Sequence, residues 1–478
     1  MPLAQGGHRM KAVRNDSMKL LMAMLLTGFA VGLSGSAAAD EKAALGLDQL
    51  IQMALESSPE LQGAEQDMVA AKADLSQAKA GQWAQMDVTG IVGPVWDAKT
   101  PYVVVTSTPL SGVYVGSIMD RDEDTIGVFG RLELMITQPL FTFGKISHRQ
   151  EAAAYGVDVK RSARDKKRGD VILKVKEYYF GLVVAQQGLK AADDTDAFIQ
   201  DARKRIQRLL ELRSTNVQEA DLYRLAAFEA DVKQFKAKAE SGARVAYLAL
   251  KQTVGYAANQ DFRLDAKELP KDSRALGNQE EYVQTALARR PELEQLQKGI
   301  AAQRSMVEAA KADLYPSIFA AGIGSFAGAP GREYWSNTYF RDEFNHVEGG
   351  VVLGAQWHFD LGIGQAKVSK AKAEHQKLIH TKDYAERNIP VEVTKYYQDA
   401  MQAETSFKAY EKAAVGARKW IVSAFTNFDM GVGTARDMFD AIDRYGKNQG
   451  EYLVNLYNYH VALANLSHAV AEYRSYNP

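Results

Sequence analysis

The chain has 478 residues, no cysteine, 58 basic and 59 acidic side chains, and a mean hydropathy of -0.29. The absence of cysteine excludes disulfide scaffolds, cysteine-ligated metal sites and catalytic thiols. The balanced charge argues against a nucleic-acid-binding protein, and the low hydropathy argues against a bundle of membrane-spanning helices.

The first 39 residues predict a secretory signal peptide. Basic residues between Arg9 and Lys19 precede an apolar run over 20–33, and small residues over 37–39 follow, as at a cleavage site. The apolar run is short for a membrane span, so we favour a cleaved signal over an uncleaved anchor. Because no cysteine follows, a lipid anchor there is excluded. Residues 40–478 are therefore expected to be exported.

The exported part of the chain contains two repeats. The stretch Ser58–Leu61 recurs 232 residues later as Arg290–Leu293, and both read x-Pro-Glu-Leu. Further matches follow at an offset of 218 residues, which indicates a longer loop in the first copy. Because so many matches keep their register, chance does not explain them. We predict one domain written as two structural repeats, about 45–270 and 277–474.

Each repeat is expected to contain a very long helix, over 145–213 in the first and 364–428 in the second. Apolar positions from Val171 to Leu189 follow a 4-3-4-3-4 spacing, and the equivalent positions from Ile389 to Phe407 repeat it. This spacing is typical of a coiled-coil seam. At 1.5 Å per residue the first helix would be roughly 100 Å long, so it has to pack on other long helices.

The strands are predicted within 84–143 and 315–360, where the apolar period changes to two. In the best example one face carries Val128, Leu132, Leu134 and Ile136, and the other carries Arg131, Glu133 and Thr137. This alternation fits a transmembrane β-barrel, and it fits half-buried strands of a soluble sheet about equally well. The acidic run Asp120–Asp124 between the first two strands is interpreted as a solvated loop tip.

Four strands per chain cannot close a barrel, because about eight are needed even for a filled one. An unclosed sheet would leave edges that lipid cannot satisfy. If the strands form a barrel, several chains must share it, and three chains would supply twelve strands.

Over about Leu45 to Tyr473 the chain resembles the TolC-like outer-membrane efflux protein family. The stretches that carry the resemblance are Ser58–Leu61, Arg290–Leu293, Gln138–Lys145, Leu314–Pro316, Gly431–Thr434 with Asp437 and Asp440, and Tyr457–Tyr459. The resemblance implies a mainly α fold with a small β part. Duplicated long helices would build a coiled-coil α-barrel, and four strands per chain would contribute to a trimeric twelve-stranded transmembrane β-barrel.

The resemblance also implies a function, a cellular location and partners. The chain would be the outer-membrane channel of a tripartite efflux or type I secretion system, extending into the periplasm. Its partners would be two further copies of itself, outer-membrane lipid, a periplasmic adaptor, and an inner-membrane pump or ABC exporter. The alternative is an exported periplasmic coiled-coil scaffold or adaptor without a channel, which leaves the alternating strands unexplained.

An enzyme is disfavoured. The histidines are scattered, and His375 and His380 lie five positions apart, which is wrong for one helix face. The sequence has no H-E-x-x-H, G-x-S-x-G or Walker motif. We expect no catalytic residue, no metal, no cofactor and no nucleic acid.

Two aspartates are the candidate channel aperture. Asp437 and Asp440 share one helix face, and in the family two aspartates at this spacing line the periplasmic opening. By resemblance, six carboxylates in a trimer would attract cations and raise some of their own pKa values. Thr434 and Asp437 also have the spacing of a helix capping box, and both roles can coexist.

The latches that close the family's aperture cannot form here in the same way. The resemblance places Phe428 and Gly433 where the family has a tyrosine and an arginine, facing Asp221 in the first repeat. Arg436 is the candidate substitute in this gate region.

Four residues are expected at the strand–helix junctions: Pro139, Gly144, Pro316 and Gly362. Proline lacks the backbone N–H that donates a hydrogen bond between strands, and it can end a helix. Glycine permits the sharp turn from strand to helix.

Overall fold

The computed structural model describes residues 43–96, 102–107, 114–119, 126–257, 259–271, 275–330, 332 and 342–474. The chain divides into two units, Met1–Ala43 and Ala44–Pro478, and the second holds the fold described below. The expected signal peptide and the acidic run Asp120–Asp124 lie outside the described residues.

The helices occur as two sets of equal length. The first set is α2 (Leu47–Ser57), α3 (Pro59–Ala80), α4 (Lys145–Glu211) and α5 (Glu219–Thr253). The second set is α6 (Gln279–Arg289), α7 (Pro291–Ala312), α8 (Ile363–Asp429) and α9 (Ala435–Ala469). Corresponding members have 11, 22, 67 and 35 residues. A short 3-10 helix, η1 (Glu472–Arg474), follows α9.

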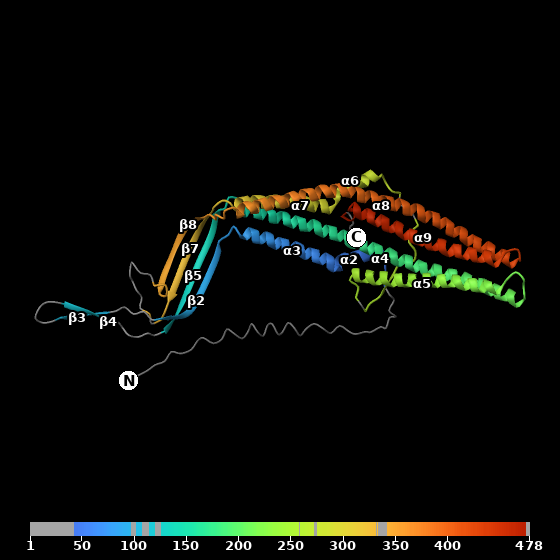
Figure 1. Ribbon diagram of the computed structural model, residues 1–478, viewed down its shortest axis with the longest axis horizontal. Coiled ribbons are helices and arrows are strands. Elements are labelled where there is room, and N and C mark those ends of the chain that lie inside the picture. Colours follow the sequence, from blue (N-terminus) through green and yellow to red (C-terminus); the bar gives the residue numbers. More distant parts are fainter. Residues whose placement is uncertain are drawn as a thin grey trace, which may run out of the picture. The chain divides into compact units, whose positions relative to one another are not determined.

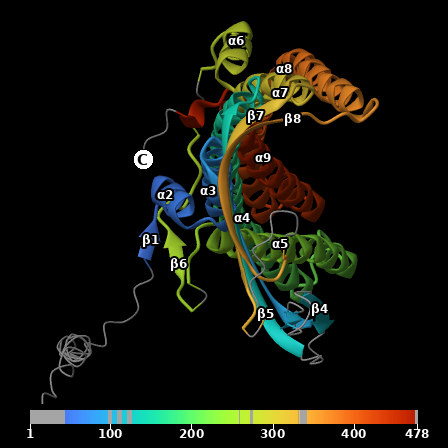
Figure 2. The same ribbon diagram turned by 90° about the vertical axis from the view of Figure 1, so that its left-hand side faces the viewer.

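Four strands form one antiparallel sheet in the order β2-β5-β7-β8. They are β2 (Gln85–Trp96), β5 (Ile126–Phe141), β7 (Ser317–Gly328) and β8 (His346–Gln356). The sheet is curved (Figure 2) and lies at the end of the helices where α3, α4, α7 and α8 meet the strands (Figure 1). The turns from α4 to α5 and from α8 to α9 lie at the opposite end of the helices (Figure 1).

Two smaller strand pairs accompany this sheet. The pair β3 (Tyr102–Ser107) and β4 (Tyr114–Met119) lies in the segment that the sequence analysis treated as a loop. The pair β1 (Ala43–Leu45) and β6 (Phe262–Leu264) has only three residues in each strand. The expected class, mainly α with a small β part, is confirmed.

Each long helix begins with the same backbone turn. Gly144 before α4 has φ 90° and Gly362 before α8 has φ 123°, values in the region that favours glycine. The preceding residues, Phe143 and Leu361, also have positive φ, at 51° and 48°. The chain therefore uses the same backbone turn to pass from strand to helix in both repeats.

The two candidate junction prolines lie at different points of the strands. Pro316 directly precedes β7, four residues after the end of α7. Pro139 lies inside β5, where the pairing with β7 shifts register between Pro139 and Phe141. A register shift is one of the few positions at which a strand tolerates proline.

The seam positions pack the long helices together. Val175 and Val393 are fully buried at equivalent points of α4 and α8, in two different apolar clusters. Pro390 lies within α8 without ending it. A third apolar cluster, which contains Ile206, Leu225 and Phe439, fills the space near the helix turns.

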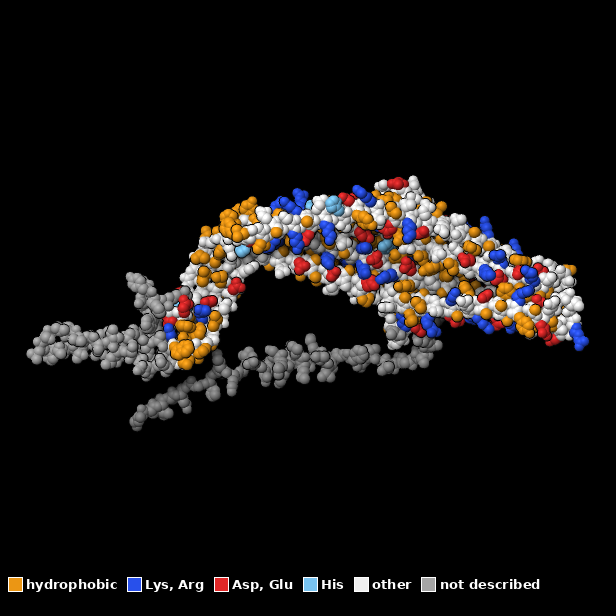
Figure 3. Space-filling view, viewed as in Figure 1, with side chains coloured by type: hydrophobic (Ala, Val, Ile, Leu, Met, Phe, Trp, Pro, Cys, Tyr) orange, Lys and Arg blue, Asp and Glu red, His pale blue; other side chains and the backbone are white. Residues whose placement is uncertain are grey.

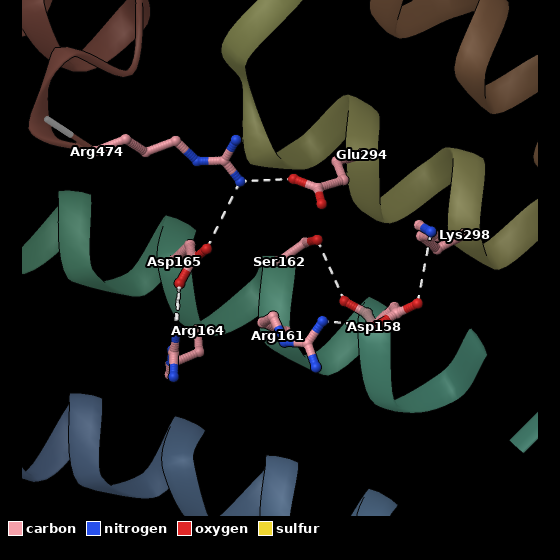
Figure 4. Close-up of polar contacts among 8 residues, drawn as sticks. All are labelled: Asp158, Arg161, Ser162, Arg164, Asp165, Glu294, Lys298 and Arg474. Atoms are coloured by element: carbon pink, nitrogen blue, oxygen red, sulfur yellow. Dashed lines mark hydrogen bonds and ion pairs between the residues drawn. The ribbon is translucent and has the colours of Figure 1, made fainter. Parts of the chain in front are cut away.

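The end of the chain is fastened to α4 and α7. Gly169 on α4 lies against the ring of Tyr473, so close that a Cβ there would be 2.4 Å from the ring. Arg474 pairs with Glu294 on α7 at 2.6 Å and with Asp165 on α4 at 3.6 Å (Figure 4). Together these contacts hold η1 across the two helices.

Candidate functional site

One face of the four-stranded sheet is apolar and exposed. The register places its large side chains on the same side of all four strands: Met86, Val88, Val92, Trp96, Ile126, Val128, Leu132, Leu134, Ile136, Phe326, Val347, Val351 and Leu353. Val351 is 85% exposed and Val92 is 78% exposed. Hydrophobic side chains gather over the sheet in Figure 3. A soluble antiparallel sheet buries such a face against its core, whereas within the described residues this one stays uncovered.

The opposite face of the sheet carries all of the sheet's charged side chains, beside apolar ones such as Ile91, Met135, Ile323 and Val352. It carries Asp87, Thr89, Arg131, Glu133, Ser325, His346, Glu348 and Gln356. Arg131 lies 3.3 Å from Glu133 and 3.6 Å from Glu343. The sheet thus separates an apolar surface from a charged one, as the alternation in the sequence indicates.

Aromatic residues surround the junction between the sheet and the helices. The ring centroids of Phe141 and Phe143 are 4.7 Å apart, and those of Phe143 and Tyr315 are 5.2 Å apart. The ring centroids of Trp357 and Phe359 are 4.6 Å apart, and the indole Nε1 of Trp357 donates to the Leu314 carbonyl oxygen at 3.0 Å. Exposed aromatic side chains beside an apolar band are typical of the boundary between lipid and water. The sequence analysis missed this group, although aromatic residues recur at both strand–helix passages.

The candidate aperture residue Asp437 caps the start of α9. Its carboxylate accepts hydrogen bonds from the Thr434 amide at 3.0 Å and the Thr434 hydroxyl at 2.7 Å. The Asp437 amide points back to the Thr434 hydroxyl at 3.3 Å, which completes a capping box. These bonds, the backbone one foremost, hold the pKa of Asp437 below its usual range. A ring of like charges would raise the pKa of Asp437, and such a ring needs carboxylates from other copies of the chain.

Asp440 and Arg436 lie beside this cap on the exposed face of α9. The Arg436 guanidinium is 3.8 Å from the Asp440 carboxylate, with both side chains more than half exposed. Arg436 is therefore placed toward its own helix, and no contact of it with the first repeat is found among the described residues.

The equivalent turn of the first repeat has a similar cap. Asp221 accepts a hydrogen bond from the Gln218 amide at 3.0 Å and lies 3.9 Å from Arg224. Asp221 and Asp437 are both the third residue of their helix. The two turns are thus built alike, although only the second has the threonine.

Phe428 and Gly433 have structural roles at the turn. Phe428 is buried in the apolar cluster that also contains Val217 and Leu225 of the first repeat. Gly433 packs against the end of α8, where a Cβ would lie 2.9 Å from the Phe428 nitrogen. The positions that the resemblance assigns to the family's latches are thus occupied by an apolar contact between the repeats.

Arg205 connects α4 to the end of α8 through a polar contact that the sequence analysis missed. It lies on α4, pairs with Asp429 at the end of α8 and with Asp201 one turn earlier, and its guanidinium is 5.1 Å from the Phe425 ring. Asp429 follows Arg205 by 224 positions, so no local pattern in the sequence could reveal this pair.

No helix in the described part of the chain is long and apolar enough to cross a membrane. In the same residues, no group of three or more histidine, aspartate or glutamate side chains is placed to hold a metal ion.

Comparison with known proteins shows which family this part of the chain belongs to. Residues 282–472 match the outer membrane efflux protein family. These residues are an outer membrane efflux protein domain. The resemblance to the TolC-like family is thereby confirmed over these residues, and this family supports an outer-membrane localisation. This is a family of efflux proteins and not of enzymes.

Solved structures share the fold at low sequence identity. The outer-membrane channel OprN is 17% identical with a TM-score of 0.71, and the match covers 89% of each chain. The Campylobacter jejuni CmeC outer membrane channel is 16% identical with a TM-score of 0.66, covering 89% of this chain and 85% of that one. The Neisseria gonorrhoeae MtrE outer membrane channel is 17% identical with a TM-score of 0.67, covering 91% and 93%. No curated protein sequence matches the chain.

Proposed function

We propose that three copies of this chain form a conduit across the outer membrane and the periplasm. The observation that carries this proposal is the sheet with one apolar exposed face and one polar face. Lipid is the solvent that suits the first face, and a water-filled lumen suits the second.

The edges of the sheet supply the reason for three copies. In the described sheet β2 and β8 each pair with one strand only, so each has one edge without a partner. In lipid such an edge costs several kcal/mol for each unsatisfied backbone group, at an order of magnitude. Pairing β8 of one copy with β2 of the next removes every edge when the ring closes. Three copies then contribute twelve strands.

The helices extend this conduit away from the membrane. The α4–α5 and α8–α9 pairs of three copies would form the wall of an α-barrel, with the helix turns at its periplasmic end. By family resemblance, this end works with a periplasmic adaptor and an inner-membrane pump or ABC exporter in efflux or type I secretion. The signal peptide predicted in residues 1–39 would deliver the chain to the periplasm.

The aspartates at the second turn would form the aperture of this conduit. Asp437 and Asp440 are both exposed on one side of α9, so six carboxylates would meet in a trimer. We expect Asp437→Ala combined with Asp440→Ala to lower the cation selectivity of channels reconstituted in planar bilayers, because the fixed negative charge is removed. Asp67→Ala is the control, since it removes an exposed carboxylate from α3, away from both helix turns, and should leave selectivity unchanged. Unchanged selectivity in the double variant would remove the aperture assignment.

Cell fractionation tests the conduit against the alternative of a periplasmic scaffold without a channel. We expect the protein in the outer-membrane fraction, with a trimer band on a gel of unheated sample that collapses to monomer on boiling. A soluble periplasmic monomer would support the scaffold and contradict the conduit.

A further inference from the structure

A polar cavity lies where the first repeat packs on the second. Its walls are α4 from the first repeat and α8 and α9 from the second, and Lys267, Glu268 and Lys271, which follow β6, complete its lining. We call it the repeat cavity. Its volume is about 510 Å³, which is within the range of small-molecule binding sites.

The segment after β6 is attached to all three helices. The Leu269 amide donates to the Gln187 side chain on α4 at 3.5 Å, and Leu269 is 2% exposed. The carbonyl oxygen of the next residue lies 2.9 Å from the Nε2 atom of His460 on α9. Lys271 lies 3.6 Å from Glu411 on α8. These contacts hold the segment beside the repeat cavity, so parts of the chain that are far apart in the sequence build one site.

Tyr452 lines the repeat cavity, and its hydroxyl makes no hydrogen bond within the described part of the chain. The side chain is 5% exposed. Burial, together with the nearby carboxylates of Glu411 and Glu268, raises the pKa of Tyr452 to about 12, so the hydroxyl keeps its proton and remains a donor. Most buried polar groups have a hydrogen-bond partner. This hydroxyl therefore indicates a ligand that carries an acceptor, such as a carbonyl oxygen.

Charged side chains of both signs line the repeat cavity. They are Lys190, Lys267, Lys271 and Arg418, and Asp194, Glu268 and Glu411. Of these residues, which all belong to the described ranges, only Lys271 and Glu411 are within ion-pair distance of a partner. A simple anion would satisfy the cations alone, whereas a zwitterion can satisfy charges of both signs.

The two ends of the repeat cavity differ. Tyr445 and Tyr452 line it from one side of α9, and at 1.5 Å per residue they are about 10 Å apart along the helix. Glu411 and Arg418 have the same separation on α8, which runs antiparallel to α9. Glu411 is therefore near Tyr452, where Glu268 also lies, and Arg418 is near Tyr445. One end offers carboxylates and the other a guanidinium.

The groups between the two ends suit a peptide backbone. Gln186 on α4 and Gln449 on α9 offer amide donors and acceptors. Lys190 and Asp194, one turn apart on α4, add one charge of each sign. A peptide of three residues spans at most about 10 Å when extended, which matches the distance between the two tyrosines.

We propose that the repeat cavity binds a short peptide of about three residues with a free amino and a free carboxyl end. The ammonium group would lie near Glu268 and Glu411, and the carboxylate near Arg418. The Tyr452 hydroxyl would donate to a carbonyl oxygen of the peptide. This site goes beyond the proposed conduit, because a single copy of the chain supplies the whole lining.

Calorimetric titration of the full chain, purified in detergent, with trialanine tests the site. We expect trialanine to bind. Trialanine with an acetylated amino end and an amidated carboxyl end should bind at least about tenfold more weakly, because it lacks both charges. Inorganic phosphate and acetate should also bind at least about tenfold more weakly, since each satisfies only the cations.

Two substitutions locate the peptide in the repeat cavity. Tyr452→Phe should weaken trialanine binding about tenfold, because the donor is lost. Tyr457→Phe, on the same helix but outside the lining, is the matched control and should bind as the unmodified chain does. Arg418→Gln should weaken binding by a similar factor, whereas Lys419→Gln, which removes the neighbouring cation outside the lining, should not. Thermal unfolding of each variant without peptide shows whether it is folded.

The outcomes of this test are separate from those for the conduit. Failure of trialanine to bind, or binding of the blocked peptide or of phosphate as tight as that of trialanine, would overturn the peptide site. Unchanged binding in both Tyr452→Phe and Arg418→Gln would overturn its place in the repeat cavity. None of these results alters where the chain is found on cell fractionation, which tests the conduit.

Discussion

Asp437 shows how one carboxylate can serve a local and an assembled role. Its bonds to Thr434 satisfy backbone donors at the start of α9, where the helix leaves such groups unpaired. The carboxylate remains exposed, so its charge is still available to a lumen. The cap and the aperture therefore do not compete.

The lowered pKa of Asp437 makes the cap sensitive to acid. The folded pKa lies below the unfolded value, so the stabilisation is present above the unfolded value of about 3.9 and is lost as pH falls through the folded one. We predict that Asp437→Asn lowers the unfolding free energy near neutral pH by about 1 kcal/mol and has a smaller effect in strong acid. Thermal unfolding across pH measures this. Asp440→Asn, which makes no capping bond, is the control, and an equal loss at every pH would contradict the account.

Tyr452 carries a buried hydroxyl that makes no hydrogen bond among the described residues. The side chain is 5% exposed, and burial raises the pKa of Tyr452 to about 12. We predict that Tyr452→Phe raises the unfolding free energy by about 1 kcal/mol, because an unpaired buried hydroxyl is removed. Tyr179→Phe is the matched variant. It deletes a hydroxyl bonded to Asp265 at 3.2 Å and should lower stability by about 1 kcal/mol. Equal effects of the two variants on thermal unfolding would be inconsistent with this view.

At the scale of the elements, the turn between α8 and α9 leaves no room for a side chain at Gly433. A Cβ at Gly433 would lie 2.9 Å from the Phe428 nitrogen and 3.0 Å from the Asn427 carbonyl carbon, and both are backbone atoms that cannot move aside easily. We predict that Gly433→Ala lowers the unfolding free energy by more than about 1 kcal/mol. At Gly416, inside α8, a Cβ would meet no other atom within 4 Å. Gly416→Ala should therefore stabilise by about 0.5–1 kcal/mol, and thermal unfolding of both variants decides the matter.

The long elements were predictable because their signals are local and repeated. The seam predicted helices over 145–213 and 364–428, and the structure has them at Lys145–Glu211 and Ile363–Asp429. Alternation predicted the faces of β5, since a period of two assigns every side chain to a side.

The remaining elements depend on distant partners. The pairing of β1 with β6 rests on three residues per strand, which is too short for a periodic signal. The bond from Arg332 to the Trp96 carbonyl oxygen joins residues 236 positions apart, and the turn between α8 and α9 depends on the pair of Arg205 with Asp429. The role of Asp437 as a cap could be read from its spacing to Thr434, but a place in an aperture depends on other copies of the chain.

At the scale of the whole molecule, duplication explains why each part occurs twice. The two helix sets have equal lengths, the long helix of each set follows a strand-to-helix turn of the same kind, and the four main strands join in one sheet. The balanced composition follows from this plan. Most residues lie in helices that suit water, and the apolar surface is concentrated on one face of a small sheet.

The central claim is that this face meets lipid while the other meets water. Single cysteines introduced at Thr89, Glu133 and Glu348 test the polar face, and those at Val88, Leu132 and Val351 test the apolar face. In outer-membrane vesicles, we predict that a small hydrophilic maleimide labels the first three positions and spares the second three. Equal labelling at all six positions would contradict a membrane-spanning sheet and, with it, the conduit.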